Sequence, residues 1–452
     1  MRWIALALCL VSTASVAGIL YVDTGGSATN SGSTDQNSAN LTGTAATVAA
    51  TVVSLDGSPD LSGVVTSGDA QSTIYINDAT NSNQKIFWIT AFDDTLNTVT
   101  VSVAHTGVTS SSWAIGGRII HTPANVESAL RAGDIYQFNN SPATATATYL
   151  TARTSGDSTS GYITIRGKSG VRPVLNVTNT SIVLTGNAQT NWLIENLELD
   201  QDGASGNVAS GWTQTLFKNI KIVDGGGDGI AVAGNTVTVH QCEISGVTGS
   251  GISTGAGSLL YAFGNYIHDN ATHGINASGN TPRMILVNNI IDSNTDRGIL
   301  SSSTPTSSSI RSMLIGNTIY GNGNSGLEVT DADTAFTLVN NIFEANGNAA
   351  GEYNVEWVAG TAEISGAHYN NVFYLGAGAN NLLNLTVDST ESTADPAFTN
   401  AAGGNFSIGI GSSAKATGYP GVFLGGTTGY MDMGPVQRQE PVGGGGGGII
   451  GD

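Results

Sequence analysis

The fold of this chain is decided by three stretches near its middle: GNYIHDNATHGI (264–275), NNIIDSNTDRGI (288–299) and GNTIYGNGNSGL (316–327). In each stretch an Asn is followed two residues later by Ile, and a Gly nine residues after the Asn is followed by Ile or Leu. The first marker recurs at Asn196, Asn219, Cys242, Asn265, Asn289, Asn317, Asn341 and Asn371. The second recurs at Gly229, Gly251, Gly274, Gly298 and Gly326. Two markers that stay in phase over steps of about 23 residues predict a solenoid in which each repeat is one coil.

The composition of a coil predicts strands and turns rather than helices. Each repeat consists of short runs rich in Val, Ile, Thr and Leu, separated by Gly, Asn, Asp and Ser. We expect an inward row three residues before each marker, at Leu193, Leu216, Val239, Ala262, Leu286, Leu314 and Leu338. An Asn inside a buried bend satisfies backbone groups and its own kind on the next coil, so we expect an Asn ladder. For the repeated Gly we expect a positive φ.

This frame resembles the right-handed parallel β-helix repeat of the pectin-lyase-like superfold. The resemblance extends over roughly residues 120 to 435, with first coils at 129–138 and 162–175 and a terminal segment at 394–420 and 430–437. It implies an all-β chain with a right-handed parallel β-helix solenoid of about eight or more coils. The superfold hosts lyases, hydrolases, esterases, adhesins and viral spikes, so it does not by itself select a function.

The chain divides by composition into four segments. Residues 1–17 combine Arg2, an apolar run from Trp3 to Val11 and small residues ending at Ala17, which predicts a secretory signal and a secreted or cell-surface location. No segment predicts a membrane span. Residues 18–118 predict an N-terminal strand and a small antiparallel β module with a hairpin turn from Asp93 to Asn97.

Residues 119–440 form the predicted β-helix with its terminal segment, and residues 441–452 a Gly-rich flexible tail. The β-helix begins with a predicted short capping helix, because Thr122 and Pro123 suit its N-cap and first turn and Gly133 its end. Such a helix would cover the open edge of the first coil.

The balance of charge is acidic. Lys and Arg number 15 and Asp and Glu 34, which gives a formal net charge of −19. This excess argues against nucleic acid and anionic membranes as partners. It also disfavours unassisted binding of polyuronates, although bridging Ca²⁺ would restore that option. Removal of the signal removes Cys9 and leaves Cys242, for which we expect a buried structural position and no intrachain disulfide.

Stacking of the coils places one row of polar residues in register. The residues before the repeated Gly are Asp228, Ser250, His273, Arg297 and Ser325. Because coils lie about 4.8 Å apart, we expect His273 roughly 10 Å from Asp228 and roughly 5 Å from Arg297. Asp228, His273 and Arg297 are therefore the candidate catalytic residues, a general acid or base beside an anion clamp. The row resembles that of galacturonan hydrolases but lacks their paired carboxylates.

Other interpretations of these residues stay open. Turn positions favour polar residues, so such a row can also arise by chance without a catalytic role. Asp292 and Asp296 lie beside Arg297 in the sequence and would neutralise its charge. Oxygen ligands for Ca²⁺ are available at Asp224, Asp228, Asp269, Asp292 and Asp296, although the metal and its ligands are not identified and no cofactor is certain.

A second row predicts a homo-oligomer interface. Two residues before each marker come Ile194, Phe217, His240, Phe263, Val287, Ile315 and Val339. Strand alternation turns this nearly apolar row outward if its neighbours point inward. Covering loops, or local twist that turns the row inward, are the alternative.

Three functional hypotheses follow. We favour a secreted β-helix scaffold that engages polysaccharide, through binding or weak processing. A second hypothesis is a structural surface protein, either a cell-surface adhesin or a phage-like spike or fibre. A third is a polysaccharide lyase or glycoside hydrolase. The sequence leaves open whether the chain is an enzyme.

Overall fold

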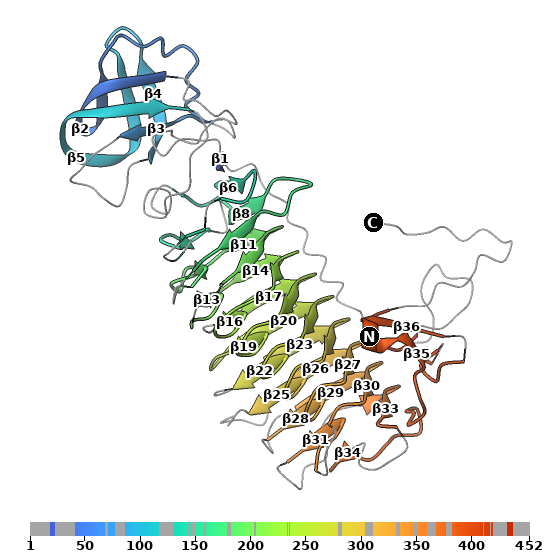
Figure 1. Cartoon of the computed structure of the whole chain (residues 1–452). Helices are drawn as coiled ribbons and strands as arrows, with labels where there is room; N and C mark the ends of the chain where they lie inside the picture. The colour runs from blue at the N-terminus through green and yellow to red at the C-terminus, as the bar shows by residue number, and fades with distance from the viewer. Residues whose placement is uncertain are drawn as a thin grey trace, which may run out of the picture. The chain divides into compact units, whose positions relative to one another are not determined.

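The computed structural model describes residues 19–22, 41–67, 71–76, 86–116 and 130–436, the last range with gaps of which 303–310, 359–367 and 419–431 are the longest. The described chain consists of β-strands and one short 3₁₀ helix, Ala401–Gly403. It divides into two compact units. The first comprises Met1–Ala143, Leu150–Val174 and Gln189–Asn196, and the second the remaining residues. Figure 1 shows the strands of both units. The predicted all-β class is confirmed.

The first unit contains the expected antiparallel module. Its four strands are β2 (Leu41–Leu55), β3 (Thr73–Ile76), β4 (Ile86–Asp93) and β5 (Thr98–Ile115), in the order β2-β5-β3-β4. The predicted hairpin turn is present, since Asp93 pairs with Thr98 and Asn97 has a φ of 51°. The Asp93 carboxylate accepts the backbone N–H groups of Thr95 and Leu96. Phe87, Trp113 and Ile115 are among the buried residues of the module's core.

Short parallel strands complete the first unit. They are β1 (Ile19–Val22), β6 (Ile135–Phe138), β7 (Leu150–Thr151), β8 (Ile163–Gly167) and β11 (Trp192–Glu195), and β9 (Val174–Asn176) spans the boundary between units. β1, β6, β8 and β11 pair side by side in that order.

The second unit is built from three parallel sheets, to which each coil contributes one strand in turn (Figure 1). Strands of the first sheet are β10 (Leu184–Thr185), β13 (Ala209–Trp212), β16 (Ile230–Val232), β19 (Ile252–Thr254), β22 (Ile275–Ser278), β25 (Ile299–Ser302), β28 (Leu327–Val329), β31 (Val355–Trp357) and β34 (Leu382–Leu383). The second sheet has β14 (Thr215–Lys218), β17 (Thr236–His240), β20 (Leu259–Phe263), β23 (Arg283–Val287), β26 (Arg311–Ile315), β29 (Ala335–Val339) and β32 (His368–Tyr369).

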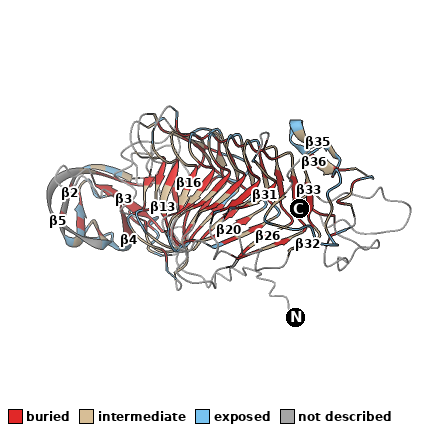
Figure 2. Ribbon diagram, turned by 90° about the horizontal axis from the view of Figure 1, so that it is seen from below, coloured by how far each residue is buried: buried red, intermediate tan, exposed pale blue. Residues whose placement is uncertain are grey.

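The third sheet directly follows the Asn markers. Its strands after β9 are β12 (Glu198–Asp200), β15 (Lys221–Ile222), β18 (Glu243–Ser245), β21 (Tyr266–His268), β24 (Ile290–Asp292), β27 (Thr318–Tyr320), β30 (Ile342–Glu344) and β33 (Val372–Tyr374). One of these strands follows each of the eight markers, in agreement with the expectation of about eight or more coils. A terminal antiparallel hairpin of β35 (Phe398–Asn400) and β36 (Asn405–Ile408) ends the described strands. Figure 2 shows buried residues alternating with intermediate ones along the coils.

The expected Asn ladder is present over five coils. Each Asn side chain donates from Nδ2 to Oδ1 of the Asn on the next coil, at 2.8 to 3.0 Å, from Asn265 through Asn289, Asn317 and Asn341 to Asn371. All five are at most 2% exposed. A second ladder, which sequence analysis missed, runs through Asn270, Asn294, Asn322 and Asn346 at the other end of the third sheet. Both ladders satisfy polar groups that the turns would otherwise bury unpaired.

The first two markers occupy a different position from the others. Asn196 and Asn219 have φ values of 56° and 51°, and so belong to the left-handed turn position that Gln241 and Asn288 occupy in later coils. The ladder positions of the first two coils are held instead by the buried Leu197 and Ile220. The inward row is displaced with them, since Leu193 and Leu216 are half-buried. A repeat frame counted on Asn alone slips by one residue there.

The repeated Gly serves close packing and not a positive φ, so that expectation was wrong. None of Gly229, Gly251, Gly274, Gly298 and Gly326 is in the left-handed region. A Cβ built on Gly274 would lie 2.5 Å from Cγ2 of Ile291 and 2.7 Å from the Gly298 carbonyl oxygen. The absent side chain therefore lets the turn approach the core of the next coil.

The apolar row is outward only in its later members. Ile194 and Phe217 are fully buried, whereas His240, Phe263, Val287, Ile315 and Val339 are half-buried on the outer side of the second sheet. Oligomerisation through this shorter row stays a prediction. Cys242 is 2% exposed, as expected. The predicted signal, the Gly-rich tail and the part of the predicted capping helix before residue 130 lie outside the described residues. No helix in the described part of the chain has the length and apolar character to cross a membrane.

Candidate functional site

The row predicted from the Gly marker is a structural feature of the second unit. The N–H of each repeated Gly bonds the carbonyl of the residue that precedes the Gly of the next coil, as from Gly251 to His273 at 2.9 Å and from Gly274 to Arg297 at 3.0 Å. Asp228, Ser250, His273, Arg297 and Ser325 therefore stack in register. The row stands at the entrance to the first sheet, immediately before β16, β19, β22, β25 and β28.

Arg297 is the centre of a dense polar cluster. Its Nη1 lies 2.8 Å from both carboxylate oxygens of Asp296, and its Nε donates to Glu328 on the next coil. Burial alone would lower the pKa of the Arg297 guanidinium, but the Glu328 and Asp296 carboxylates hold it above its usual value. Two carboxylates thus bind Nε and Nη1 of this guanidinium, as the neutralisation alternative anticipated for Asp296.

His273 is held in its neutral form within the same cluster. It is 8% exposed, and its Nδ1 accepts the backbone N–H of Arg297 at 3.4 Å. An accepting Nδ1 carries no proton, so this is the neutral imidazole. Burial lowers the pKa of His273, although the Asp296 carboxylate at 3.5 Å opposes the change. The structure therefore brings His273 and Arg297 together, as predicted.

Asp228 does not join this cluster through any hydrogen bond. Its Oδ1 accepts the backbone N–H of Ser250 at 2.8 Å, while its own N–H donates to Asn207. Asp228 therefore fastens one turn to the next. Its negative charge still contributes to the environment of the His273 imidazole.

A carboxyl pair that the sequence analysis missed lies beside Arg297. Glu328 and Glu356 occupy the same outward position on β28 and β31 and are partners in the strand register. Glu328 is 7% exposed and bound by Arg297. Burial raises the pKa of Glu356 and the neighbouring Glu328 raises it further, while the donated hydroxyl of Ser325 opposes the change. One carboxyl is thus paired with a guanidinium, and it lies beside another whose pKa is raised.

The signal for this pair was present in the sequence frame. Two residues after the repeated Gly, each coil places an outward side chain on the first sheet: Ala231, Ser253, Asn276, Leu300 and Glu328. The sequence analysis tested only the position before the Gly. Glu356 was further hidden because its coil has Asn354 where the Gly would be expected.

Metal binding receives no support from side-chain geometry. Among the residues that the structure describes, no three or more His, Cys, Asp and Glu side chains form a group that could hold a metal ion. Of the candidate calcium ligands, Asp224 accepts the N–H of Gly225, and Asp296 and Asp228 are engaged as described above.

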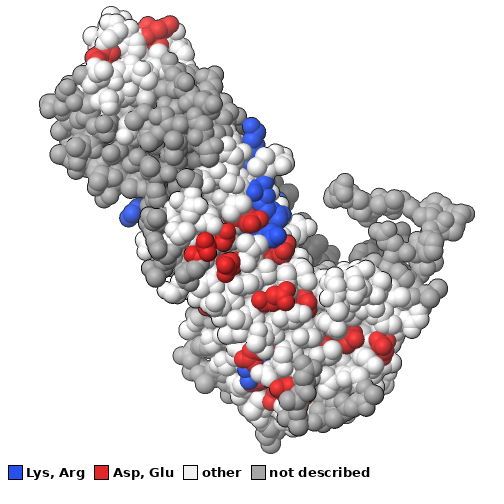
Figure 3. Space-filling model, in the orientation of Figure 1, with Lys and Arg blue, Asp and Glu red and all other residues white. Residues whose placement is uncertain are grey.

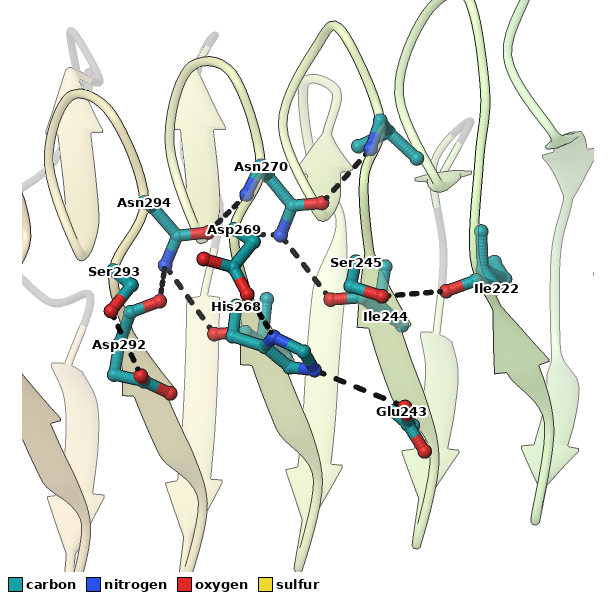
Figure 4. Close-up of polar contacts among 12 residues, drawn as sticks. Ile222, Glu243, Ile244, Ser245, His268, Asp269, Asn270, Asp292, Ser293 and Asn294 are labelled. Carbon is teal, nitrogen blue, oxygen red and sulfur yellow. Dashed lines mark hydrogen bonds and ion pairs between the residues drawn. The ribbon is translucent and has the colours of Figure 1, made fainter. Parts of the chain in front are cut away.

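A second titratable cluster lies on the outer side of the third sheet (Figure 4). His268 Nδ1 is 2.7 Å from an Asp269 oxygen, and its Nε2 is 3.9 Å from a Glu243 oxygen. The Tyr266 ring stacks on the His268 ring with centroids 3.9 Å apart. Asp292 is the register partner of His268 on the next strand. Acidic side chains also dot the coils of the second unit on the face seen in Figure 3.

Comparison with known proteins agrees with this architecture. Residues 180–343 match the family model described as a right-handed β-helix region. The chain contains a right-handed parallel β-helix. No curated protein gives a significant match to its sequence. Pectate lyase Pel9A, a solved structure, superposes with a TM-score of 0.52 at 14% identity, covering 70% of this chain and 92% of the lyase.

Two further solved structures are similar over a smaller share of this β-helix protein. An alginate lyase from Paenibacillus sp. str. FPU-7 gives a TM-score of 0.43 at 18% identity, covering 59% of this chain and 95% of the lyase. The A-module of the mannuronan C-5 epimerase AlgE6 from Azotobacter vinelandii gives 0.31 at 14% identity, covering 59% and 92%. At 14% identity the likeness to the pectate lyase concerns the fold alone.

Proposed function

We propose that this protein binds a polysaccharide on the outer side of the first sheet and hydrolyses a glycosidic bond at Glu328 and Glu356. The pairing of these two residues on adjacent strands carries the proposal. Neighbouring strands lie about 4.8 Å apart, so parallel side chains hold their carboxyl groups roughly 5 Å apart. Retaining glycoside hydrolases use two carboxyl groups about 5–5.5 Å apart.

The two carboxyls differ in the way that this reaction requires. Glu356, whose pKa is raised, is the proton donor to the leaving oxygen. Glu328, whose carboxylate pairs with Arg297, attacks the anomeric carbon as the glycosidic C–O bond breaks. Water then attacks the glycosyl–Glu328 ester, and the Glu356 carboxylate takes the proton of that water. Both carboxyls return to their starting states and the anomeric configuration is retained.

The charge of the site favours a neutral glycan. Asp296, Glu328 and Glu356 bring three carboxyl groups around one guanidinium, which is already paired. A uronate chain would meet repulsion here without a free cation to offset it. A leader at residues 1–17 would deliver the protein to the cell surface or medium, where polysaccharides are found.

The test uses the purified chain and a panel of neutral and acidic polysaccharides. We expect new reducing ends from a neutral glycan, with the first product in the anomeric configuration of the substrate by NMR. Glu328→Gln removes the nucleophile and abolishes turnover. Glu356→Gln lowers turnover of the polysaccharide at least about 100-fold but spares aryl glycosides whose leaving group needs no proton. Asp202→Asn, an exposed carboxyl change, serves as control.

Other outcomes discriminate the competing functions. Unsaturated products would identify a lyase and overturn hydrolysis. Glycan binding without any product would overturn hydrolysis and favour the scaffold hypothesis. His273→Ala distinguishes a positioning role of His273 from the catalytic role of Glu328. If His273 only positions Arg297, its loss shifts the pH profile of the activity through Glu328. Loss of Glu328 itself removes activity at every pH.

A further inference from the structure

The C-terminal hairpin, β35 with β36, packs against the outer side of the third sheet (Figure 1). The Phe406 and Phe398 rings meet Tyr320 of β27 edge-on, with centroids 5.5 Å and 6.1 Å away. Ile408 joins Ile342 and Val372 in one apolar cluster, with Phe398 packed against it. Aromatic pairs of this kind contribute about 0.5–1.5 kcal/mol each beyond burial of their area. The hairpin is thus held by a small apolar contact.

Two carboxyls flank the aromatic contact on the same outward row. Asp292 and Glu344 are the register partners of Tyr320 on the strands before and after it. Asp292 is 5% exposed, and its Oδ1 is a buried atom to which no donor makes a hydrogen bond of good geometry, although the Tyr266 hydroxyl lies close enough to act on this carboxyl. Oε2 of Glu344 is buried and unpartnered in the same way. Where a carboxyl oxygen is buried without a hydrogen-bond donor, the neutral carboxyl is far more stable than the carboxylate.

The surroundings of both groups favour the proton. Burial raises the pKa of Asp292 to about 6, opposed by the Ser293 hydroxyl, which donates to Oδ2, and by His268 and Tyr266 of β21. Burial raises the pKa of Glu344 to about 7, and Asp395, just before β35, raises it further. The other titratable groups that face this row are Asp269, Tyr320 and, in register with Glu344, Tyr374.

We propose that the C-terminal hairpin is a pH-controlled clasp, which stays closed on the third sheet while Asp292 and Glu344 carry protons and loosens when both ionise. The sign follows from linkage. A carboxyl whose pKa is raised by closure stabilises the closed state fully below its ordinary pKa, near 4, and this contribution is lost as the pH rises through about 6 to 7. The clasp is independent of the chemistry at Glu328 and Glu356.

Hydrogen exchange of the full chain, read by mass spectrometry, tests the clasp. Peptides covering 398–408 are compared at about pH 5 and about pH 8 after correction for the intrinsic exchange rate, and we expect the opening constant to rise at least about tenfold. In the double variant Asp292→Asn with Glu344→Gln, both groups stay neutral, so the corrected exchange is the same at both pH values. Asp202→Asn keeps the full pH response.

Phe406→Ala calibrates the measurement. Loss of its contact with Tyr320 raises exchange in the hairpin at both pH values. The proposal is overturned if the wild-type hairpin is equally protected at both pH values, or if the double variant keeps the pH response. Equal exchange in Phe406→Ala and wild type would also overturn it, because the Tyr320 contact would then not hold the hairpin. Should the double variant fail to fold, the single variants must each reduce the pH response.

Discussion

Two adjacent asparagines in one turn are expected to differ sharply in their sensitivity to substitution. Asn289 is fully buried in the first ladder, whereas Asn288 is exposed and has a φ of 55°. Asn289 makes four side-chain hydrogen bonds. Its Nδ2 donates to the Ala262 carbonyl and to Asn317, both at 2.9 Å, and its Oδ1 accepts the backbone N–H and the side-chain amide of Asn265.

The magnitude for Asn289→Ala follows from the groups left behind. The backbone N–H of Asn265 loses its acceptor in a buried turn, which costs about 1–3 kcal/mol. Loss of each of the other three hydrogen bonds leaves a partner group that keeps a second contact, so each loss costs about 0.5–1 kcal/mol. We therefore expect a loss of about 4 kcal/mol. Asn288→Gly removes a left-handed non-glycine residue and changes stability by less than about 1 kcal/mol.

Urea unfolding followed by circular dichroism measures both variants. The linear extrapolation is valid if the transition stays cooperative, so the slopes must agree between variants. Hydrogen exchange in β21 and β24 supplies a local measure, since a solenoid can open by coils. A loss below about 1 kcal/mol for Asn289→Ala, or an equal loss for Asn288→Gly, would refute the importance of the ladder.

Three further predictions follow from the coils. Gly274→Ala forces a methyl group against Ile291, which lowers the free energy of unfolding by about 2–3 kcal/mol and with it the thermal midpoint. The added methyl group of Gly411→Ala meets open space, so this variant changes the free energy of unfolding by less than about 1 kcal/mol. Cys242→Asn is neutral or stabilising in urea, because the thiol already contacts the backbone groups that a ladder Asn would bond, whereas Cys242→Val loses stability. If the outward row joins protomers, light scattering of the wild type gives a molar mass that is a multiple of the chain mass. Phe263→Ser then lowers this molar mass to that of one chain. A monomeric wild type would exclude the interface.

The repeat architecture was predictable because its determinants are local and periodic. The phase of Asn265, Asn289 and Asn317 with the glycines nine residues later reflects a buried ladder and a close turn, both of which every coil must rebuild. Periodicity failed where the determinant changed position. Asn196 and Asn219 share a residue type with the ladder but stand in the left-handed turn, which tolerates Asn for a different reason.

The candidate site was predictable only in part, because its contacts cross coils at two different positions. The row before the Gly correctly placed His273 beside Arg297. The partner of Arg297, however, comes from an outward strand position of the next coil, and its identity depends on side-chain reach rather than on spacing. Glu328 and Glu356 became visible as a pair only when the strand register was known.

The two ladders give each coil a fixed side and an adjustable side. Between the Asn and the Gly markers the length is almost constant, nine residues in four of the five repeats, because the strand there is fastened at both ends. The differences in repeat length therefore fall between the Gly and the next Asn, which are 14 residues apart at 251–265 and 19 at 298–317. New sequence can thus enter the protein on one flank of every coil without disturbing the stack. That flank follows the strands that carry Glu328 and Glu356, so the chain can remodel what surrounds them while its scaffold is unchanged.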